Sequence, residues 1–293
     1  MIKLKRAVLF ILIFILCITV YGQQFDLSFS MDWEEAKISG QSSVNLNSAG
    51  VRLPGGRFLG EEILEDAFPA LLRPHLLSIQ YDSSSSIGDL LSRGELSLGD
   101  IDSISYAAER YTPSLSGDFL NLLANYSLSL NTLSNIIRPT RRFYSALPPL
   151  LPASAAEYSG IIIIANTELP VHGRLSSMFA VPCLFPKIWD TQMNLIYERD
   201  MFEAGINGNY LMLNYTSIEN IFHPTPSGLL SPLSELLGSN PLRIIARGTY
   251  GIYPTDLIID REDALLILST ENNRRLLREG RVLFVLNGEV LVQ

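Results

Sequence analysis

Few residues in this chain are suited to acid–base chemistry. The sequence contains three histidines, His75, His172 and His223, and no Gly-x-Ser-x-Gly motif that would place a nucleophilic serine on a sharp turn. A hydrolytic triad needs a nucleophile with a histidine within hydrogen-bonding reach. The motif for such a triad is therefore absent, and any catalytic site has to be sought in less specific combinations.

The best combination of catalytic residue types is Glu168 with His172 and Arg174. These residues follow the apolar run Ile161–Ile164, which reads as a central strand, and α/β proteins commonly bind ligands at the carboxyl ends of such strands. An exported hydrolase would need Glu168 and His172 to converge in a concave pocket. The alternative is that residues 167–177 form a solvated surface loop with ordinary polar residues.

The patterns for metal and cofactor binding are also missing. The three histidines are far apart in sequence, whereas metal-binding histidines are usually paired at helical or turn spacing. The acidic residues Asp256, Asp260, Glu262 and Asp263 do not have EF-hand spacing, and helix capping accounts for most of them. The glycines around Thr249 lack the remainder of a dinucleotide fingerprint. We expect no metal and no cofactor.

The charge of the chain disfavours an anionic partner. The formal net charge is −8, and it becomes −11 when a predicted leader containing Lys3, Lys5 and Arg6 is removed. An acidic protein is not attracted to nucleic acid or to an anionic surface. The aromatic residues are scattered and are not interleaved with basic ones, so they do not indicate a stacking platform for single strands. We expect no nucleic-acid partner.

The first 22 residues have the composition of an export signal. A basic start is followed by the apolar run Ala7–Val20, and the small residue Gly22 precedes Gln23. The run is shorter than the roughly 20 residues that span a bilayer, so we expect cleavage after Gly22 rather than retention as an anchor. The expected location is the periplasm or outer envelope. No later apolar segment is long enough to predict a transmembrane span after cleavage.

The positions of the two cysteines decide whether the mature chain can form a disulfide. Cys17 lies within the predicted signal, so Cys183 would be the only thiol of the mature chain and no internal disulfide could form. Lipidation at Cys17 is disfavoured because the bulky Leu16 precedes it. In its apolar surroundings, Cys183 is expected to be a small buried side chain rather than a nucleophile.

Several elements can be predicted from periodicity and turn chemistry. Apolar residues at helical spacing predict a helix over Phe58–Leu72 that ends before Pro74, and Ser97 with Asp100 predicts a capping box. Alternation over Leu120–Leu130 predicts a half-buried strand. Asn287-Gly288 predicts a type I′ turn between two strands.

These elements indicate an α+β fold with mixed sheets, packed helices and two subdomains. We expect a signal peptide over residues 1–22, an N-terminal α+β domain over 23–137, and a C-terminal α/β-like domain over 157–293. Residues 138–156 contain four prolines and no apolar periodicity, which is typical of a linker or an overlying loop.

Several segments, mainly in the C-terminal half, share a recognisable pattern: Tyr158–Ile163, Phe185–Asp190, Asn194–Glu198, Ala246–Gly248, Asp260–Ala264 and Leu276–Val282. They resemble LPP20-like envelope proteins and flagellar-assembly relatives of spirochaetes and proteobacteria. The resemblance implies a periplasmic or outer-envelope role, near the flagellum in some relatives, and no known chemistry. At Ala165-Asn166-Thr167 the chain lacks the charged Asp-Ala-Arg that such proteins often carry.

The leading hypothesis is therefore an exported, non-enzymatic periplasmic or envelope-associated protein that binds another envelope component, with an envelope protein as the expected partner. An exported hydrolase with its site in the loop 167–174 remains the alternative. The sequence identifies neither the partner nor the oligomeric state.

Overall fold

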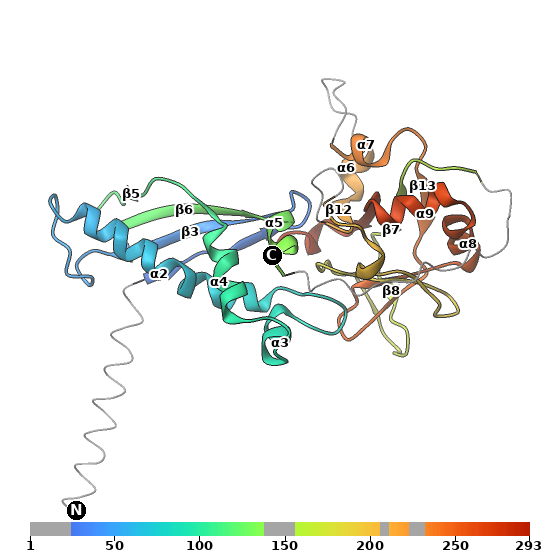
Figure 1. Ribbon diagram of the computed structural model, residues 1–293, viewed down its shortest axis with the longest axis horizontal. Helices are drawn as coiled ribbons and strands as arrows, with labels where there is room; N and C mark the ends of the chain where they lie inside the picture. The colour runs from blue at the N-terminus through green and yellow to red at the C-terminus, as the bar shows by residue number, and fades with distance from the viewer. Residues whose placement is uncertain (1–24, 138–155, 206–210, 223–231) are drawn as a thin grey trace, which may run out of the picture. The chain divides into compact units, whose positions relative to one another are not determined.

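The structure is a computed structural model that describes residues 25–137, 156–205, 211–222 and 232–293 (Figure 1). The predicted signal peptide and all but the last residue of the predicted linker lie outside these ranges. The chain divides into two compact units. Unit 1 comprises Met1–Phe29, Ser39–His75 and Ser105–Leu128, and unit 2 comprises Ser30–Ile38, Leu76–Ile104 and Ser129–Gln293. Strands and helices occur in both units, which confirms the predicted α+β class.

Unit 1 is built on an antiparallel sheet. The sheet has the order β1-β3-β6-β4, with β5 also paired to β6. The strand predicted from alternation is β6, which begins at Asn121 and ends at Ser129. The strands are β1 (Phe25–Leu27), β3 (Lys37–Asn45), β4 (Glu109–Arg110), β5 (Ser114–Leu115) and β6 (Asn121–Ser129).

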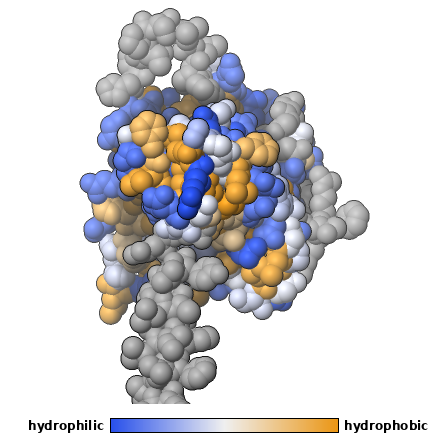
Figure 2. All heavy atoms as spheres, turned by 90° about the vertical axis from the view of Figure 1, so that its left-hand side faces the viewer, coloured by the Kyte–Doolittle hydropathy of each residue, from blue (hydrophilic) through white to orange (hydrophobic). Residues whose placement is uncertain are grey.

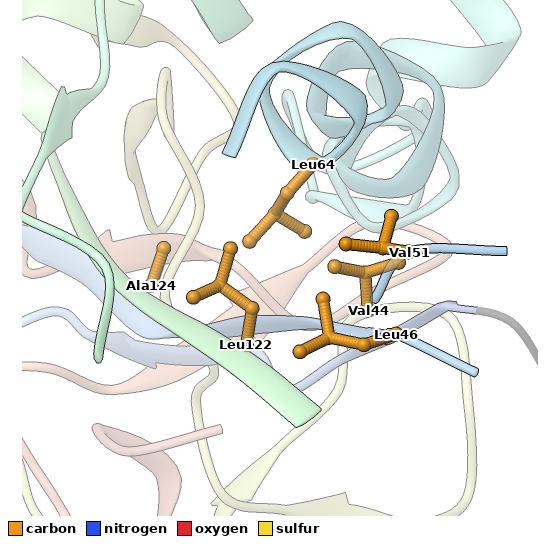
Figure 3. Close-up of a cluster of buried hydrophobic side chains, with 6 residues drawn as sticks. All are labelled: Val44, Leu46, Val51, Leu64, Leu122 and Ala124. Carbon is orange, nitrogen blue, oxygen red and sulfur yellow. The ribbon is translucent and has the colours of Figure 1, made fainter. Parts of the chain in front are cut away.

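Helix α2 (Arg57–Ser78) packs its apolar side against this sheet. Figure 3 shows Leu64 of α2 pointing toward Leu122 and Ala124 of β6 and toward Val44 of β3. Leu46 and Val51 complete this cluster of buried residues. Burial of such side chains is the main stabilising contribution to a small core.

The predicted end of this helix before Pro74 is wrong. Helix α2 contains both Pro69 and Pro74 and continues to Ser78. Proline removes one backbone hydrogen bond and crowds the preceding turn. Buried residues continue at helical spacing through Phe68, Leu72 and Leu76, so the apolar stripe extends across the prolines and its burial compensates for the lost bond.

Unit 2 contains a parallel sheet with the order β12-β16-β7-β13. The run of isoleucines forms β7, which lies between two neighbours, as predicted for a strand covered on both faces. Helices α6 and α7 contribute side chains that pack against Ile162, Leu283 and Val285. The elements are β7 (Ile161–Ala165), β12 (Asn214–Ser217), β13 (Leu242–Ile245), β16 (Val282–Leu286), α6 (Ile218–Phe222) and α7 (Pro232–Leu237).

A second, mixed sheet of unit 2 has the order β11-β10-β15-β14. Its strands β10 and β15 are parallel, and the two outer pairs are antiparallel. A separate two-stranded sheet pairs β8 with β9. The strands are β8 (Leu169–Pro170), β9 (Ser177–Met178), β10 (Ile188–Asp190), β11 (Leu195–Tyr197), β14 (Gly248–Tyr250) and β15 (Asp256–Ile259).

Short helices complete the fold. The predicted capping box is confirmed: the Ser97 backbone N–H donates to Asp100, and the Asp100 N–H donates to Ser97 Oγ. The helices are α3 (Ile87–Ser92), α4 (Leu98–Tyr106), α5 (Leu130–Ile136), α8 (Arg261–Ser269), α9 (Glu271–Arg278) and the 3₁₀ helices η1 (Arg199–Met201) and η3 (Gly288–Val290).

The end of the chain differs from its prediction. Asn287 has φ −67°, whereas a type I′ turn needs positive φ, and its side chain accepts a hydrogen bond from the Glu289 N–H at the start of η3. The following residues pair with strand β2 (Ser30–Asp32): the Met31 N–H donates to Gln293, and the Gln293 N–H donates back to Met31. The last residues of the chain therefore pair with β2 and not with the preceding strand β16. Asn287 caps η3 instead of forming a hairpin turn.

No helix in the described parts of the chain is both long enough and apolar enough to cross a membrane.

Candidate binding surface

The loop singled out by its polar residues folds as a short hairpin. Leu169 of β8 pairs with Met178 of β9, and Pro170 pairs with Ser177. Between these strands the Arg174 N–H donates to the Val171 carbonyl at 3.0 Å. Gly173 has φ +78°, a left-handed conformation that glycine adopts without steric cost, so the turn can be tight.

The three candidate catalytic residues are all exposed on this hairpin. Within the described chain, no hydrogen bond or ion pair joins the Glu168 carboxylate to the His172 imidazole. His172 instead contacts β14, and Arg174 contacts the turn between β14 and β15. A Glu–His pair that transfers protons to a bound substrate has to converge on it. The hydrolase alternative therefore remains a prediction that rests on residue types alone.

The hairpin is fixed to β14 through the His172 backbone and to the β14–β15 turn through Arg174. The His172 N–H donates to the Thr249 carbonyl at 2.8 Å. The Arg174 guanidinium donates to the carbonyl oxygens of Gly251 at 3.2 Å and Ile252 at 2.9 Å. A guanidinium presents several donors in a rigid plane, so Arg174 holds the two turns together rather than offering a free charge.

A row of ring contacts runs beside this junction. The imidazole of His172 lies 5.9 Å from the Tyr250 ring, and Tyr250 meets the Trp189 indole edge-on with centroids 5.6 Å apart. The ammonium of Lys187 lies 5.9 Å from the centre of the Trp189 ring. These are distances at which aromatic pairs and cation–π pairs attract.

A buried carboxylate positions the tryptophan of this row. Asp256 is inaccessible to solvent, and its two oxygens accept hydrogen bonds from the Trp189 indole N–H and from the Lys187 backbone N–H, each at 3.0 Å. Burial raises the pKa of Asp256 above its ordinary value, and the bonds from Trp189 and Lys187 offset part of that rise. Burial of the Asp256 carboxyl group costs free energy, and the hydrogen bond from Trp189 fixes the orientation of the indole ring.

Exposed apolar side chains gather on the same two turns. Leu175 and Met178 extend from the hairpin, and Tyr250, Ile252 and Tyr253 extend from the β14–β15 turn. Large contiguous patches of exposed apolar side chains commonly mark interaction sites. We name this the β8–β14 surface, defined by His172, Arg174, Leu175, Met178, Trp189, Tyr250, Ile252 and Tyr253.

Sequence analysis identified only part of this surface. The segment from Gly248 to Gly251 drew attention as an incomplete dinucleotide fingerprint, and Ile252 and Tyr253 were not singled out. The sequence does contain a signal for this part of the surface: two tyrosines and an isoleucine lie around a glycine in a turn, where polar residues are more common. Their proximity to Arg174 depends on hydrogen bonds across more than 70 residues of chain, which no local pattern reveals.

Cys183 belongs to a different, buried part of unit 2. Its backbone exchanges two hydrogen bonds with the Tyr215 hydroxyl, and its side chain is fully buried, as expected. Burial raises the pKa of the Cys183 thiol well above its ordinary value, and the nearby Asp256 adds to that rise. A thiol that resists ionisation is a poor nucleophile.

A small pocket lies beside Cys183. It is lined by Trp33, Asn214 and Tyr215 among others, and its volume of about 10 Å³ is on the scale of a single water molecule. Trp33 is only 3% exposed, and among the described residues its indole Nε1 has no hydrogen-bond acceptor. The pocket is too small for an organic substrate.

The remaining candidate residues do not assemble into a site. His75 stacks on Phe29 with ring centroids 5.0 Å apart, and His223 lies outside the described residues. Asp260 forms an exposed ion pair with Arg247 at 2.6 Å. In the described ranges, no group of three or more His, Cys, Asp or Glu side chains is arranged to hold a metal ion.

Comparison with known proteins gives a family for both regions of the chain. Residues 24–136 match the family model of the N-terminal domain of Treponema pallidum Tp0624. Residues 160–288 match the model of the second domain of the same protein. No curated protein shows significant similarity to the chain. Over these two regions, in the same order, the chain belongs to the spirochaete family represented by the first two domains of Tp0624.

Proposed function

We propose that this protein is exported to the periplasm or outer envelope and acts there, without enzymatic chemistry, by binding another envelope protein through the β8–β14 surface. The observation that carries the proposal is the group of exposed apolar and aromatic side chains on two turns that hydrogen bonds hold together. The basic start and apolar run of residues 1–22 support the location.

The composition of the β8–β14 surface favours a protein as the partner. Tyrosine, tryptophan, methionine and arginine are enriched in protein–protein interfaces, and a few such residues commonly supply most of the binding energy. Here Tyr250, Tyr253, Trp189, Met178 and Arg174 are combined with the exposed Leu175 and Ile252.

The surface is also rigid, which favours tight binding. Arg174 fixes one turn to the other, and Asp256 fixes the indole of Trp189 from below. Side chains that are already ordered lose less conformational entropy when a partner binds.

The resemblance to LPP20-like and flagellar-assembly proteins extends the proposal to a place near the flagellum. It rests on segments in the second matched region, such as Phe185–Asp190, of which the last three residues form β10. Localisation of a tagged full-length protein in cells tests this part: enrichment at flagellar bases supports it, and uniform envelope labelling contradicts it. Recovery of the protein in the cytosol with its first methionine retained contradicts the export proposal itself.

A matched pair of isoleucines tests the binding surface. Ile252 on the β14–β15 turn and Ile245 on β13 are each 63% exposed, and both belong to unit 2. A photocrosslinking residue at position 252 should join the full-length protein to one defined envelope protein in cells, whereas position 245 should not. The crosslink should disappear when Leu175→Ser or Tyr253→Ser is added.

Equal crosslinking from positions 252 and 245, or a crosslink that survives both serine substitutions, contradicts a specific surface. Binding is then measured with the purified partner. A single serine substitution of a buried interface anchor is expected to weaken the affinity by about 2 kcal/mol, or roughly 30-fold.

A further inference from the structure

The hairpin of the β8–β14 surface extends a sheet of unit 2. An isolated parallel bridge between Val171 and Thr249 joins β8 to β14, and the His172 N–H donates to the Thr249 carbonyl at 2.8 Å. Because β8 also pairs with β9, the strands follow one another in the order β11-β10-β15-β14-β8-β9. Among the described strands, β9 is therefore the last one on this side of the sheet.

The backbone of Ser177 in β9 faces away from β8. The Val171 N–H donates to the Ser176 carbonyl at 3.0 Å. Along an antiparallel pair, residues whose N–H and C=O groups point at the partner strand alternate with residues whose groups point outward. Ser177 follows Ser176 and lies opposite Pro170, which has no N–H. Within the described ranges, neither the N–H nor the carbonyl of the exposed Ser177 has a hydrogen-bond partner.

This edge lacks the side chains that usually prevent strands from pairing. Natural proteins protect open edges with charged residues or proline. Edge strand β4 of unit 1 consists of Glu109 and Arg110, and edge strand β13 of unit 2 carries the exposed Arg243. The segment Leu175–Phe179 contains no charged residue and no proline, and the side chain of Leu175 is fully exposed. The edge of β9 is therefore open to pairing with another strand.

The two faces of the hairpin differ at this edge. Met178 pairs with Leu169, which is buried, and Met178 itself is 41% exposed. Met178 therefore lies at the border of the buried face of the sheet. Successive side chains of a strand point to opposite faces, so Ser177 points to the other face. A strand added beside β9 would bury apolar side chains next to Met178 and keep polar side chains next to Ser177.

Exposed apolar side chains alone do not specify what binds them. On the face of the molecule that Figure 2 shows, hydrophobic side chains also gather among hydrophilic ones. Unit 1 exposes Phe58 and Phe119, but Arg57 and Glu61 lie close to Phe58 in sequence and have opposite charges. An unpaired strand edge is more specific, because its N–H and C=O groups are matched by an extended polypeptide backbone.

We propose that the partner binds by adding an extended segment of its own chain to the edge of β9, and that apolar and polar side chains alternate along this segment. The proposal rests on the proposed function and deepens it, since it gives the conformation and the pattern of the segment that is bound. Backbone hydrogen bonds to Ser177 supply affinity, and the side chain beside Met178 supplies specificity, as in other cases of strand addition.

An array of synthetic peptides tests this mode of binding. Each peptide has about eight residues and capped ends, with threonine at every second position and valine, isoleucine, leucine, phenylalanine or tyrosine at the others. The purified full-length protein, in the processed form in which cells yield it, should bind at least one of these peptides. N-methylation of one alternate set of residues in that peptide should abolish binding. N-methylation of the other set should change the affinity by less than about threefold, because only one edge of an added strand faces β9.

Two substitutions of Ser177 separate the backbone from the side chain. Ser177→Pro removes the outward N–H at a position where an edge strand tolerates proline, and should weaken peptide binding at least about tenfold. Ser177→Ala keeps the N–H and should bind within about twofold of the parent protein. If thermal unfolding shows that the proline variant is less stable than the alanine variant, the methylated peptides decide the question.

Three results overturn strand addition: no peptide binds, methylation of either set abolishes binding equally, or a stable Ser177→Pro variant binds as well as the parent protein. A crosslink from Ile252 without peptide binding also overturns it and leaves the proposed function intact. Peptide binding without that crosslink supports the edge as a peptide site and contradicts the proposed function. A dimer of the parent protein in sedimentation that Ser177→Pro dissociates identifies a second copy as the occupant, and contradicts a segment of another protein.

Discussion

The indole N–H of Trp189 donates a 3.0 Å hydrogen bond to Oδ2 of Asp256, a carboxyl group that solvent does not reach. The other oxygen of Asp256 accepts from the Lys187 N–H. Through this bond, a residue in the interior of unit 2 sets the orientation of an aromatic ring that contacts Tyr250 on the β8–β14 surface. The Asp256 carboxyl group in the core is therefore connected directly to the aromatic side chains of the β8–β14 surface.

Asp256→Ala tests that connection. The substitution leaves two partly buried donors, the Trp189 indole N–H and the Lys187 backbone N–H, without acceptors. Each unsatisfied donor costs about 1–3 kcal/mol, so the free energy of unfolding should fall by at least about 2 kcal/mol in urea denaturation. Asp256→Asn keeps one acceptor oxygen and should lose less. Equal stability of the alanine variant and the parent protein contradicts the role of Asp256.

The same carboxyl group predicts a pH dependence. Because burial raises its pKa in the folded state above the ordinary 3.8, the folded protein binds a proton at Asp256 more tightly than the unfolded chain does. The contribution of Asp256 to stability is then greatest below pH 3.8 and falls as the pH rises through the folded-state pKa. Urea unfolding of the parent protein and of Asp256→Asn, compared at several pH values, should show the parent losing stability relative to the variant as pH rises. A constant difference contradicts the expected shift.

Gly251 should be the least replaceable residue of the β14–β15 turn. It has φ +120°, and an added Cβ would lie 2.4 Å from Ser83 Cβ and 2.5 Å from the Tyr253 carbonyl oxygen. Gly251→Ala therefore meets both a forbidden backbone conformation and a clash, and should cost about 3 kcal/mol or more. Gly173→Ala is the control, because Gly173 also has positive φ but has open space around it. It should cost about 1–2 kcal/mol. Thermal unfolding of both variants measures the difference.

Local patterns predicted the elements whose sequence signal and packing agree. The isoleucines of β7 form a buried parallel strand because β-branched residues pack well when both faces are covered. Ser97 and Asp100 cap a helix because three-residue spacing brings each side chain to the other's backbone N–H. Such interactions span a few residues, and the sequence alone contains what determines them.

Predictions failed where distant packing decides the outcome. Helix α2 continues through Pro74 because Leu76 is buried beyond it. Asn287 caps η3 because the last residues of the chain pair elsewhere: Gln293 pairs with Met31 of β2, about 260 residues earlier in the chain. The surroundings of the candidate catalytic residues also depend on distant contacts, although their catalytic role itself stays a prediction. Glu168, His172 and Arg174 indicated an active loop by residue type, but the tertiary hydrogen bonds of Arg174 to Gly251 and Ile252 place that loop in an apolar surface.

The core of unit 1 gives a prediction of stability. Leu64 is nearly inaccessible and packs into the cluster shown in Figure 3. Leu64→Ala removes buried methyl groups and leaves a cavity, which should cost about 2–5 kcal/mol. Leu59→Ala, five residues earlier on the exposed side of α2, should change stability by less than about 0.5 kcal/mol. Urea unfolding of the two alanine variants checks this, and similar losses for both contradict the assignment of Leu64 to the core.

Glu34 predicts sensitivity to acid in unit 2. Its carboxylate accepts hydrogen bonds from the Thr216 hydroxyl, from the Ser217 N–H at 3.1 Å and from the Asn220 amide at 2.6 Å. Partial burial acts to raise the pKa of Glu34, but these bonds outweigh it and hold the pKa below the ordinary 4.5. The ionised side chain therefore ties β12 and the start of α6 to the segment between β2 and β3.

The sign of the pH effect follows from that lowered pKa. A carboxyl group with a depressed folded-state pKa contributes stability above its unfolded pKa of 4.5 and loses that contribution as pH falls through the folded value. The parent protein should be more stable than Glu34→Gln at pH 7, and the two should converge below pH 4.5. Chemical unfolding at several pH values across this range measures the difference in stability. Glu35→Gln, a substitution of the exposed neighbouring residue, is the control for the loss of one charge. If Glu34→Gln keeps the same deficit at every pH, its effect is steric, and the ionised hydrogen bonds are not what holds these segments together.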